Sequence, residues 1–254
     1  MMRLDIQALC QKGLVRDNNE DMVSLGGMLL RDDQMSFPVE IDDDSQFCLL
    51  VADGMGGHEQ GERASQELLD YLAAHFKERT FDSETIEDEL CSLVKQFSDQ
   101  LNWQASEERQ LLPMGCTLTG VVWVRSKAFL LNAGDSRTYR FRNGILRQLT
   151  QDETPRGITG DPSASKSLLN CIGGGAEGNL VVEDITHRLM DGDMLLICSD
   201  GLTDMVPDDM IEHVMSTTEN PAEELYRMAC QNGGRDNVSI VVARYSVEIL
   251  GSLF

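Results

Sequence analysis

The spacing of hydrophobic and polar residues changes several times along the chain. Residues 3–10 alternate between apolar and polar side chains, which predicts a half-buried strand. Continuous apolar runs at 47–52 and 194–198 predict buried strands, the second over 193–198, and Asp-Gly follows closely after each. From 60 to 77 and from 83 to 104, apolar residues recur every three to four positions, so both segments are predicted to be long amphipathic helices.

The remaining pattern indicates hairpins and shorter helices. Asn143-Gly144, between two strand-like runs, is a strong signal for a two-residue hairpin turn, and Ser83 is a suitable N-cap for the second helix. Further strands are predicted at 117–124, 128–133, 138–142, 145–149 and 238–245, further helices at 208–215 and 222–230, and a loop at 150–167.

This order of elements favours an α+β fold. Helices grouped between runs of strands are typical of antiparallel sheets that pack as layers with helices outside. A parallel α/β order would also accommodate two helices between strands. The hairpin signals favour the antiparallel arrangement.

Composition narrows the classes of function. The 254 residues include 21 Lys and Arg against 43 Asp and Glu, a formal net charge of −22. Such a surface disfavours binding to nucleic acid and to anionic membranes. No apolar run approaches the ~20 residues of a membrane span, and no apolar segment near the start suggests a secretory signal. The seven cysteines are scattered, as reduced thiols are, so we expect a cytoplasmic protein.

Several acidic residues lie at the ends of predicted strands. A single Asp-Gly usually marks a turn, but carboxylates gathered at one sheet edge repel each other unless a cation neutralises them. Oxygen ligands of this kind suit Mg²⁺ or Mn²⁺, and glycine lets the backbone carbonyl of Gly54 approach closely. The residues concerned are Glu20, Asp21, Asp53, Asp135, Asp200 and Asp236.

Six short motifs follow one another along the chain. They are R-D-N-N-E-D (16–21), V-A-D-G-M-G-G-H (51–58), G-C-T-L-T (115–119), N-A-G-D-S-R (132–137), C-S-D-G-L-T-D (198–204) and G-R-D-N-V-S (234–239). In this order they closely resemble the metal-dependent serine/threonine protein phosphatases of type 2C, in their bacterial branch. The resemblance runs from about residue 4 to residue 245.

The resemblance implies a four-layer α/β/β/α sandwich with two central antiparallel sheets, formed by a single domain over residues 1–254. A short flap at about 150–168 would lie beside two Mn²⁺ or Mg²⁺ ions. By resemblance, Asp53 would bridge both ions, Asp200 and Asp236 would hold the first, the Gly54 carbonyl would hold the second with support from Glu20 and Asp21, Asp135 with Asp200 would form a weaker third site, and Arg16 would bind the substrate phosphate.

The implied reaction is hydrolysis of phosphoserine and phosphothreonine on proteins by a metal-activated water. Arg16 and Asp53 are the expected catalytic residues, and no phosphoenzyme is needed. The expected partners are phosphorylated proteins, including a serine/threonine kinase or its targets, and the expected state is a monomer.

The sequence departs from the family pattern at two places. Met55 stands where animal relatives carry a proposed general-acid histidine, and His58 lies nearby. Gln151-Asp152-Glu153 lacks the histidine of the bacterial flap. A phosphoprotein-binding pseudophosphatase is the alternative, although Asp53, Asp200 and Asp236 are all present. A two-metal nuclease also uses clustered carboxylates, but the negative charge argues against it.

The negative charge also predicts a substrate preference. An acidic surface repels acidic peptides, so we expect faster turnover of phosphopeptides with basic residues near the phosphate. Turnover of basic and acidic phosphopeptides at low salt measures this effect, and equal rates would contradict the prediction.

Overall fold

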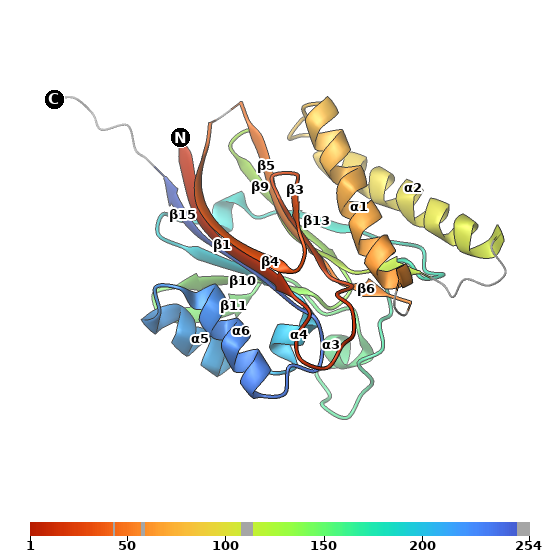
Figure 1. The fold of residues 1–254 in the computed structure, drawn as a ribbon. Coiled ribbons are helices and arrows are strands. Elements are labelled where there is room, and N and C mark those ends of the chain that lie inside the picture. Colours follow the sequence, from red (N-terminus) through yellow and green to blue (C-terminus); the bar gives the residue numbers. More distant parts are fainter. Residues whose placement is uncertain (43, 57–58, 108–113, 248–254) are drawn as a thin grey trace.

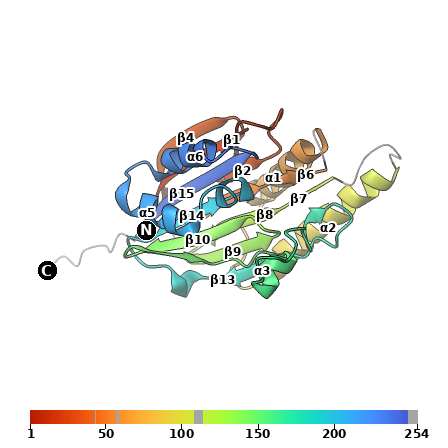
Figure 2. The ribbon, with the colours of Figure 1, turned by 90° about the horizontal axis from the view of Figure 1, so that it is seen from below.

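Two antiparallel sheets form the centre of the molecule in the computed structural model, which describes residues 1–42, 44–56, 59–107 and 114–247. Helices α1 (Glu59–Glu78) and α2 (Ile86–Glu107) cover one sheet, and α5 (Asp208–Thr217) and α6 (Pro221–Gln231) cover the other (Figure 1). Viewed from below, α5 and α6 lie on one side of the sheets and α2 on the other (Figure 2). The predicted α+β sandwich of four layers is confirmed.

Every described strand pair is antiparallel, so the parallel α/β alternative is wrong. The sheet against α5 and α6 has the order β11 (Ile145–Gln148), β10 (Arg137–Arg142), β14 (Met194–Cys198), β15 (Val238–Val247), β1 (Met2–Gln11), β4 (Asp33–Ile41). The sheet against α1 and α2 has the order β13 (Val181–Asp184), β9 (Lys127–Ala133), β8 (Leu118–Val124), β5 (Gln46–Ala52), β2 (Met22–Leu25), β3 (Met28–Leu30).

The remaining described elements are short. They are the small sheet β12 (Ile172–Gly173), β7 (Gly115–Cys116), β6 (Gly54–Met55), the helices α3 (Pro155–Thr159) and α4 (Asp200–Thr203), and the 3₁₀ helix η1 (Thr186–Arg188).

Three hydrophobic cores hold the four layers together. One lies between α1, α2 and their sheet, with Leu68 and Val122 fully buried. The second lies between the two sheets and includes Trp123. The third lies under α5 and α6 and includes Tyr139 and Leu225. Because the long helices bury one stripe and most strands bury one or both faces, the hydrophobic pattern is an effective guide to most of these elements.

The predicted hairpin at Asn143-Gly144 is confirmed. It joins β10 to β11, with φ of 50° at Asn143 and 80° at Gly144. A turn with two positive φ angles matches the right-handed twist of the strands, and asparagine and glycine adopt such angles most readily.

Two predictions at element boundaries are wrong. The second helix begins at Ile86 and not beside Ser83, because Asp82 forms the preceding turn: its Oδ1 accepts from the Glu84 N–H at 2.9 Å and its carbonyl accepts from the Ile86 N–H at 2.9 Å. The segment 150–167 is not only loop. It contains α3, where the Thr154 hydroxyl caps the Gly157 N–H at 3.0 Å.

No helix in the described part of the chain is both long and apolar enough to span a membrane.

Candidate metal centre

An acidic cleft of about 290 Å³ lies where loops from both sheets meet. Four aspartates reach it from different strand ends. Asp53 follows β5, Asp135 follows β9, Asp200 begins α4 just after β14, and Asp236 precedes β15. Its walls include Arg16, Glu20, Asp53, Gly54, Asp135, Asp200 and Asp236, and Asp21 is buried beside it. All the residues that the sequence singled out therefore lie together, although they span more than two hundred positions of the chain.

Asp53 lies between β5 and β6, and Gly54 begins β6. The Asp53 N–H donates to the Thr117 hydroxyl at 3.1 Å, and the Thr117 N–H donates to the Asp53 carbonyl at 2.9 Å. A Cβ on Gly54 would stand 2.1 Å from the Gly61 carbonyl oxygen and 2.5 Å from that of Glu20. Only glycine fits this position, and the backbone is held where its carbonyl can act as a ligand.

Glu20 and Asp21 lie just before β2 and are almost entirely buried. The Asn237 side-chain oxygen accepts from the Glu20 N–H at 2.8 Å, and the Ser199 hydroxyl donates to Asp21 Oδ2 at 2.7 Å. Among the described residues, Asp21 Oδ1 is buried and has no hydrogen-bond partner. A buried carboxylate oxygen without a partner is costly, so this atom is a candidate ligand for a cation or its water.

Asp236 forms an ion pair that the sequence did not predict. Arg16 Nη2 lies 2.6 Å from Asp236 Oδ2, and both side chains are partly exposed to the cleft. This hydrogen bond is the main cause that raises the pKa of Arg16. The predicted phosphate-binding arginine is therefore held at the cleft by one of the predicted metal ligands.

Burial and mutual repulsion raise the pKa of several carboxyl groups here. The pKa of Asp21 rises to about 7, chiefly through burial, with hydrogen bonds from Ser199 and Ser239 opposing it. Burial and then Asp200 raise the pKa of Asp135 to about 7. Burial and then Asp204 raise that of Asp200 to about 6. The pKa of Asp53 lies well above its usual value, through burial first and then the neighbouring aspartates.

We expect the metal-free protein to become less stable as the pH rises from about 5 to about 8. Carboxyl groups with a raised folded-state pKa contribute stability that is fully present below the unfolded pKa of about 4 and is lost as the pH passes the folded values of about 6 and 7. Melting temperatures in EDTA at constant ionic strength measure this, and Asp21→Asn should flatten the slope. A melting temperature that increases over the same range would contradict the prediction.

The donor set fits divalent cations by its chemistry. It consists of oxygen atoms alone, and the unpartnered Asp21 Oδ1 and the raised carboxyl pKa values both indicate negative charge without compensation. Within the described ranges, no three Asp, Glu, His or Cys side chains are already closed around one point at ligand distance.

The segment 150–168 contributes residues that the sequence did not single out. Lys166 and Leu168 line the cleft, and the Lys166 ammonium pairs with Asp204. Arg137 Nε and Nη2 bind both oxygens of Asp152 at 2.8 and 2.6 Å, which ties the start of the segment to β10. Lysine on a loop gives no periodic signal, so only the fold reveals this contact.

Met55, which stands where animal members of the resembled family carry a histidine, lines the cleft. The nearby His58 lies outside the described residues.

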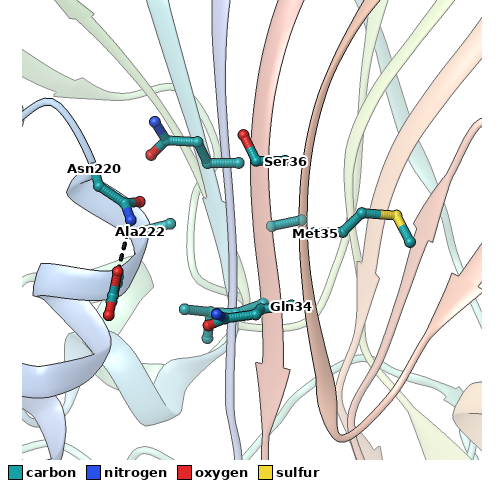
Figure 3. A pocket seen from close by; sticks show the side chains of 9 residues that line it. Gln34, Met35, Ser36, Asn220 and Ala222 are labelled. Atoms are coloured by element: carbon teal, nitrogen blue, oxygen red, sulfur yellow. Dashed lines mark hydrogen bonds between the residues drawn. The ribbon is translucent and has the colours of Figure 1, made fainter.

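A second hollow lies between β1, β4 and the start of α6 (Figure 3). Gln34 and Ser36 of β4 line it, and the Asn220 amide donates to Glu223 at 2.7 Å. None of the clustered carboxylates lines this hollow, so the acidic cleft is the candidate site.

Comparisons with known proteins agree with the motifs. A sequence model described as "Protein phosphatase 2C" matches residues 26–231. The serine/threonine phosphatase stp of Listeria monocytogenes is 32% identical over 249 residues, which cover 91% of this chain and 92% of that protein. The serine/threonine protein phosphatase PstP of Mycobacterium tuberculosis is 35% identical over 249 residues, which cover 93% of this chain and 44% of PstP.

Solved structures share the fold. The catalytic domain of PstP in complex with two manganese ions superposes with a TM-score of 0.76 at 31% identity, covering 97% of this chain and 100% of the other. Stp1 from Staphylococcus aureus superposes with a TM-score of 0.76 at 26% identity, covering 96% and 94%.

Proposed function

This chain belongs to the protein phosphatase 2C family, and we propose that its acidic cleft is the binuclear centre of a metal-dependent serine/threonine protein phosphatase. The enzyme hydrolyses phosphoserine and phosphothreonine on proteins and uses two Mn²⁺ or Mg²⁺ ions. One observation carries the assignment to this cleft: its acidic side chains come from loops far apart in the sequence and surround Gly54 and Arg16.

Each residue has a proposed role. Asp53, which lines the cleft with Gly54 and the other aspartates, would bridge the two ions by its place in the family's motif. The remaining ligands would be Asp200 and Asp236 for the first ion, Gly54 with Glu20 and Asp21 for the second, and Asp135 with Asp200 for a weaker third.

When bound, the two ions supply the Lewis acidity that activates a water and neutralises the phosphoryl oxygens. The protein's own residues position the Asp53 backbone and the substrate phosphate. Thr117 fixes the Asp53 backbone through two hydrogen bonds. Arg16 leaves Asp236 and grips the phosphate, since a guanidinium matches phosphate in a bidentate geometry.

Hydrolysis of a phosphothreonine peptide tests the function. We expect turnover with Mn²⁺ or Mg²⁺, loss of turnover in EDTA, and recovery when the metal is restored. Undiminished turnover in EDTA would contradict the mechanism. Metal binding and phosphopeptide binding without any turnover would instead indicate a pseudophosphatase.

Arg16→Met is expected to raise KM for the phosphopeptide roughly 10- to 100-fold, the value of a lost hydrogen bond to a charged group. Arg16→Lys keeps the positive charge but loses the two-pronged guanidinium that binds phosphate in a bidentate way. Its KM should therefore lie between those of wild type and Arg16→Met. Steady-state kinetics with saturating Mn²⁺ measure both. Equal KM values in all three proteins would show that Arg16 does not bind the phosphate.

We further propose a single domain over residues 1–254 in which 150–168 acts as a short flap over the cleft. We also propose that the enzyme is a monomer and that it is cytoplasmic; seven cysteines without a disulfide, as in a reducing compartment, support the location. Its phosphoprotein substrates would include a serine/threonine kinase or the targets of one.

A further inference from the structure

A group of arginines lines a separate cavity beside the hairpin β10–β11. Arg140, Arg147 and Arg188, with Gln148 and Leu149, enclose about 240 Å³. None of the residues described as lining it is acidic. In a chain with a net charge of −22, a cavity walled by arginines alone among charged residues is a local reversal of sign.

The cavity lies at the margin of the space between the two sheets. Side chains alternate along β10, so Tyr139 and Phe141 face the core under α5 and α6, and Arg140 shares its face with Thr138. The Thr138 hydroxyl lies 3.0 Å from that of Thr119 in the opposite sheet. Arg140 therefore occupies an inward-facing position, which arginine rarely takes unless it is paired.

The positive charge of this cavity is only partly compensated. Arg140 and Arg147 are directly opposite each other in the β10–β11 register, a placement that destabilises like charges. Neither forms an ion pair within the described part of the chain. Nearby Arg142 differs, because Asp193 binds it with two hydrogen bonds. Of the three lining arginines, Arg188 alone has an acidic partner, Glu183.

Arg140 also holds an unused donor. Its Nη1 donates to the Arg188 carbonyl at 2.9 Å, but its Nε is buried and has no partner among the residues that the structure describes. Burial, followed by the charge of Arg142, lowers the pKa of Arg140. A buried guanidinium N–H without an acceptor is costly, and an anion in the cavity would satisfy it.

We propose that this arginine pocket, defined by Arg140, Arg147 and Arg188, binds a phosphoryl group at a site separate from the catalytic cleft. Arginine forks match the geometry of phosphoryl oxygens, and the cavity is smaller than those that hold drug-sized ligands. The group can come from free phosphate or a small phosphorylated molecule, or from a second phosphorylated residue of a protein substrate.

Nuclear magnetic resonance of the arginine Nε–Hε groups tests the site directly. Inorganic phosphate is titrated into the Mg²⁺-loaded, ¹⁵N-labelled protein at low ionic strength, with sodium chloride of matched ionic strength as the reference. The Arg140 signal is identified by its loss in Arg140→Lys, and the Arg16 signal reports on the cleft independently. We expect the Arg140 signal to shift and saturate with phosphate but not with chloride.

Arg147→Gln is the decisive variant, because Arg147 is exposed and its guanidinium makes no hydrogen bond in the part of the chain that the structure describes. It should raise the phosphate Kd at the Arg140 signal by about tenfold or more, the effect of one charge-assisted hydrogen bond. Arg244→Gln, at an exposed position of β15, changes the charge equally and should leave this Kd unchanged. An Arg140 signal that phosphate does not move, or an unchanged Kd in Arg147→Gln, would overturn the proposal.

A kinetic comparison separates the two sources and, unlike the titration, rests on the proposed phosphatase function. If the phosphoryl group belongs to the substrate, a doubly phosphorylated peptide will have a lower KM than its singly phosphorylated form, and Arg147→Gln will remove the difference. If phosphate moves the Arg140 signal but the two peptides have equal KM, the ligand is a free phosphate or a small phosphorylated molecule.

Discussion

Asp53→Asn is expected to lower kcat for a phosphothreonine peptide by about a thousandfold or more, equivalent to about 4 kcal/mol of lost transition-state stabilisation. Asparagine has the shape of aspartate, and the hydrogen bonds between the Asp53 backbone and Thr117 do not involve the carboxylate. The substitution therefore removes the charge from the centre of the acidic cleft and leaves the turn between β5 and β6 in place.

The same substitution is expected to stabilise the protein in EDTA at about pH 8. Burial and the neighbouring carboxylates hold the pKa of Asp53 well above its usual value, so its ionised form opposes folding when no cation is present. Wild type should gain roughly 5–10 °C in melting temperature from a divalent ion at about a hundred times its Kd, since that binding contributes about 2.7 kcal/mol. Asp53→Asn should lose most of this gain.

Asp99→Asn serves as the matched control. Asp99 is exposed on α2 and pairs with Lys95, so the change in charge is the same without any change in the cleft. Its kcat and its response to Mn²⁺ should equal those of wild type. If Asp53→Asn retains full turnover, or if both variants lose activity alike, the assignment of the cleft is wrong.

The elements that the hydrophobic pattern predicted are those with at least one well-buried face. In β1 and α1 burial follows the sequence period, whereas β8 and β9 are buried on both faces and are mostly apolar. β4 was not predicted, although Met35, Phe37, Val39 and Ile41 face the core and alternate with exposed residues. It is an edge strand with Pro38 inside it, and a proline within an apolar–polar alternation argues against a strand. The signal for α3 was present in Thr154-Pro155, a cap followed by proline at the first turn, but glycine and serine around it favoured a loop.

The sequence predicted which residues form the candidate site but not the contacts between them. Motifs named the acidic residues, and the structure brings them to one cleft. Asp21 is buried against Ser199, 178 positions away. This contact depends on how the residue before β2 lies against the residue after β14, which no local sequence pattern contains. The Arg16–Asp236 pair likewise joins residues 220 positions apart. The ligand roles themselves stay predictions until metal binding is measured in the variants.

Arg142→Met is expected to lower the free energy of unfolding by about 3–5 kcal/mol, because it leaves a buried carboxylate without its cation. Asp193 is fully buried, and Arg142 binds both of its oxygens, at 2.5 and 2.7 Å. Among the described residues, this carboxylate accepts one further hydrogen bond, from the Met190 N–H to Asp193 Oδ2 at 2.8 Å. Methionine fills the space of the arginine stem, so the loss reports mainly on the charge. Urea unfolding at fixed Mn²⁺ measures it.

The double variant Arg142→Met/Asp193→Asn distinguishes the unpaired charge from lost packing. Asparagine can still accept from the Met190 N–H and carries no charge, so the double variant should recover most of the stability that Arg142→Met loses. Arg227→Met is the exposed comparison, since Arg227 pairs with Glu224 on the surface of α6 and should change stability little. Because Arg142 and Asp193 do not line the acidic cleft, kcat and KM should be unchanged in all three proteins. A double variant no more stable than Arg142→Met would mean that the arginine stem's packing, and not the buried carboxylate, holds this end of β10 against the loop before β14.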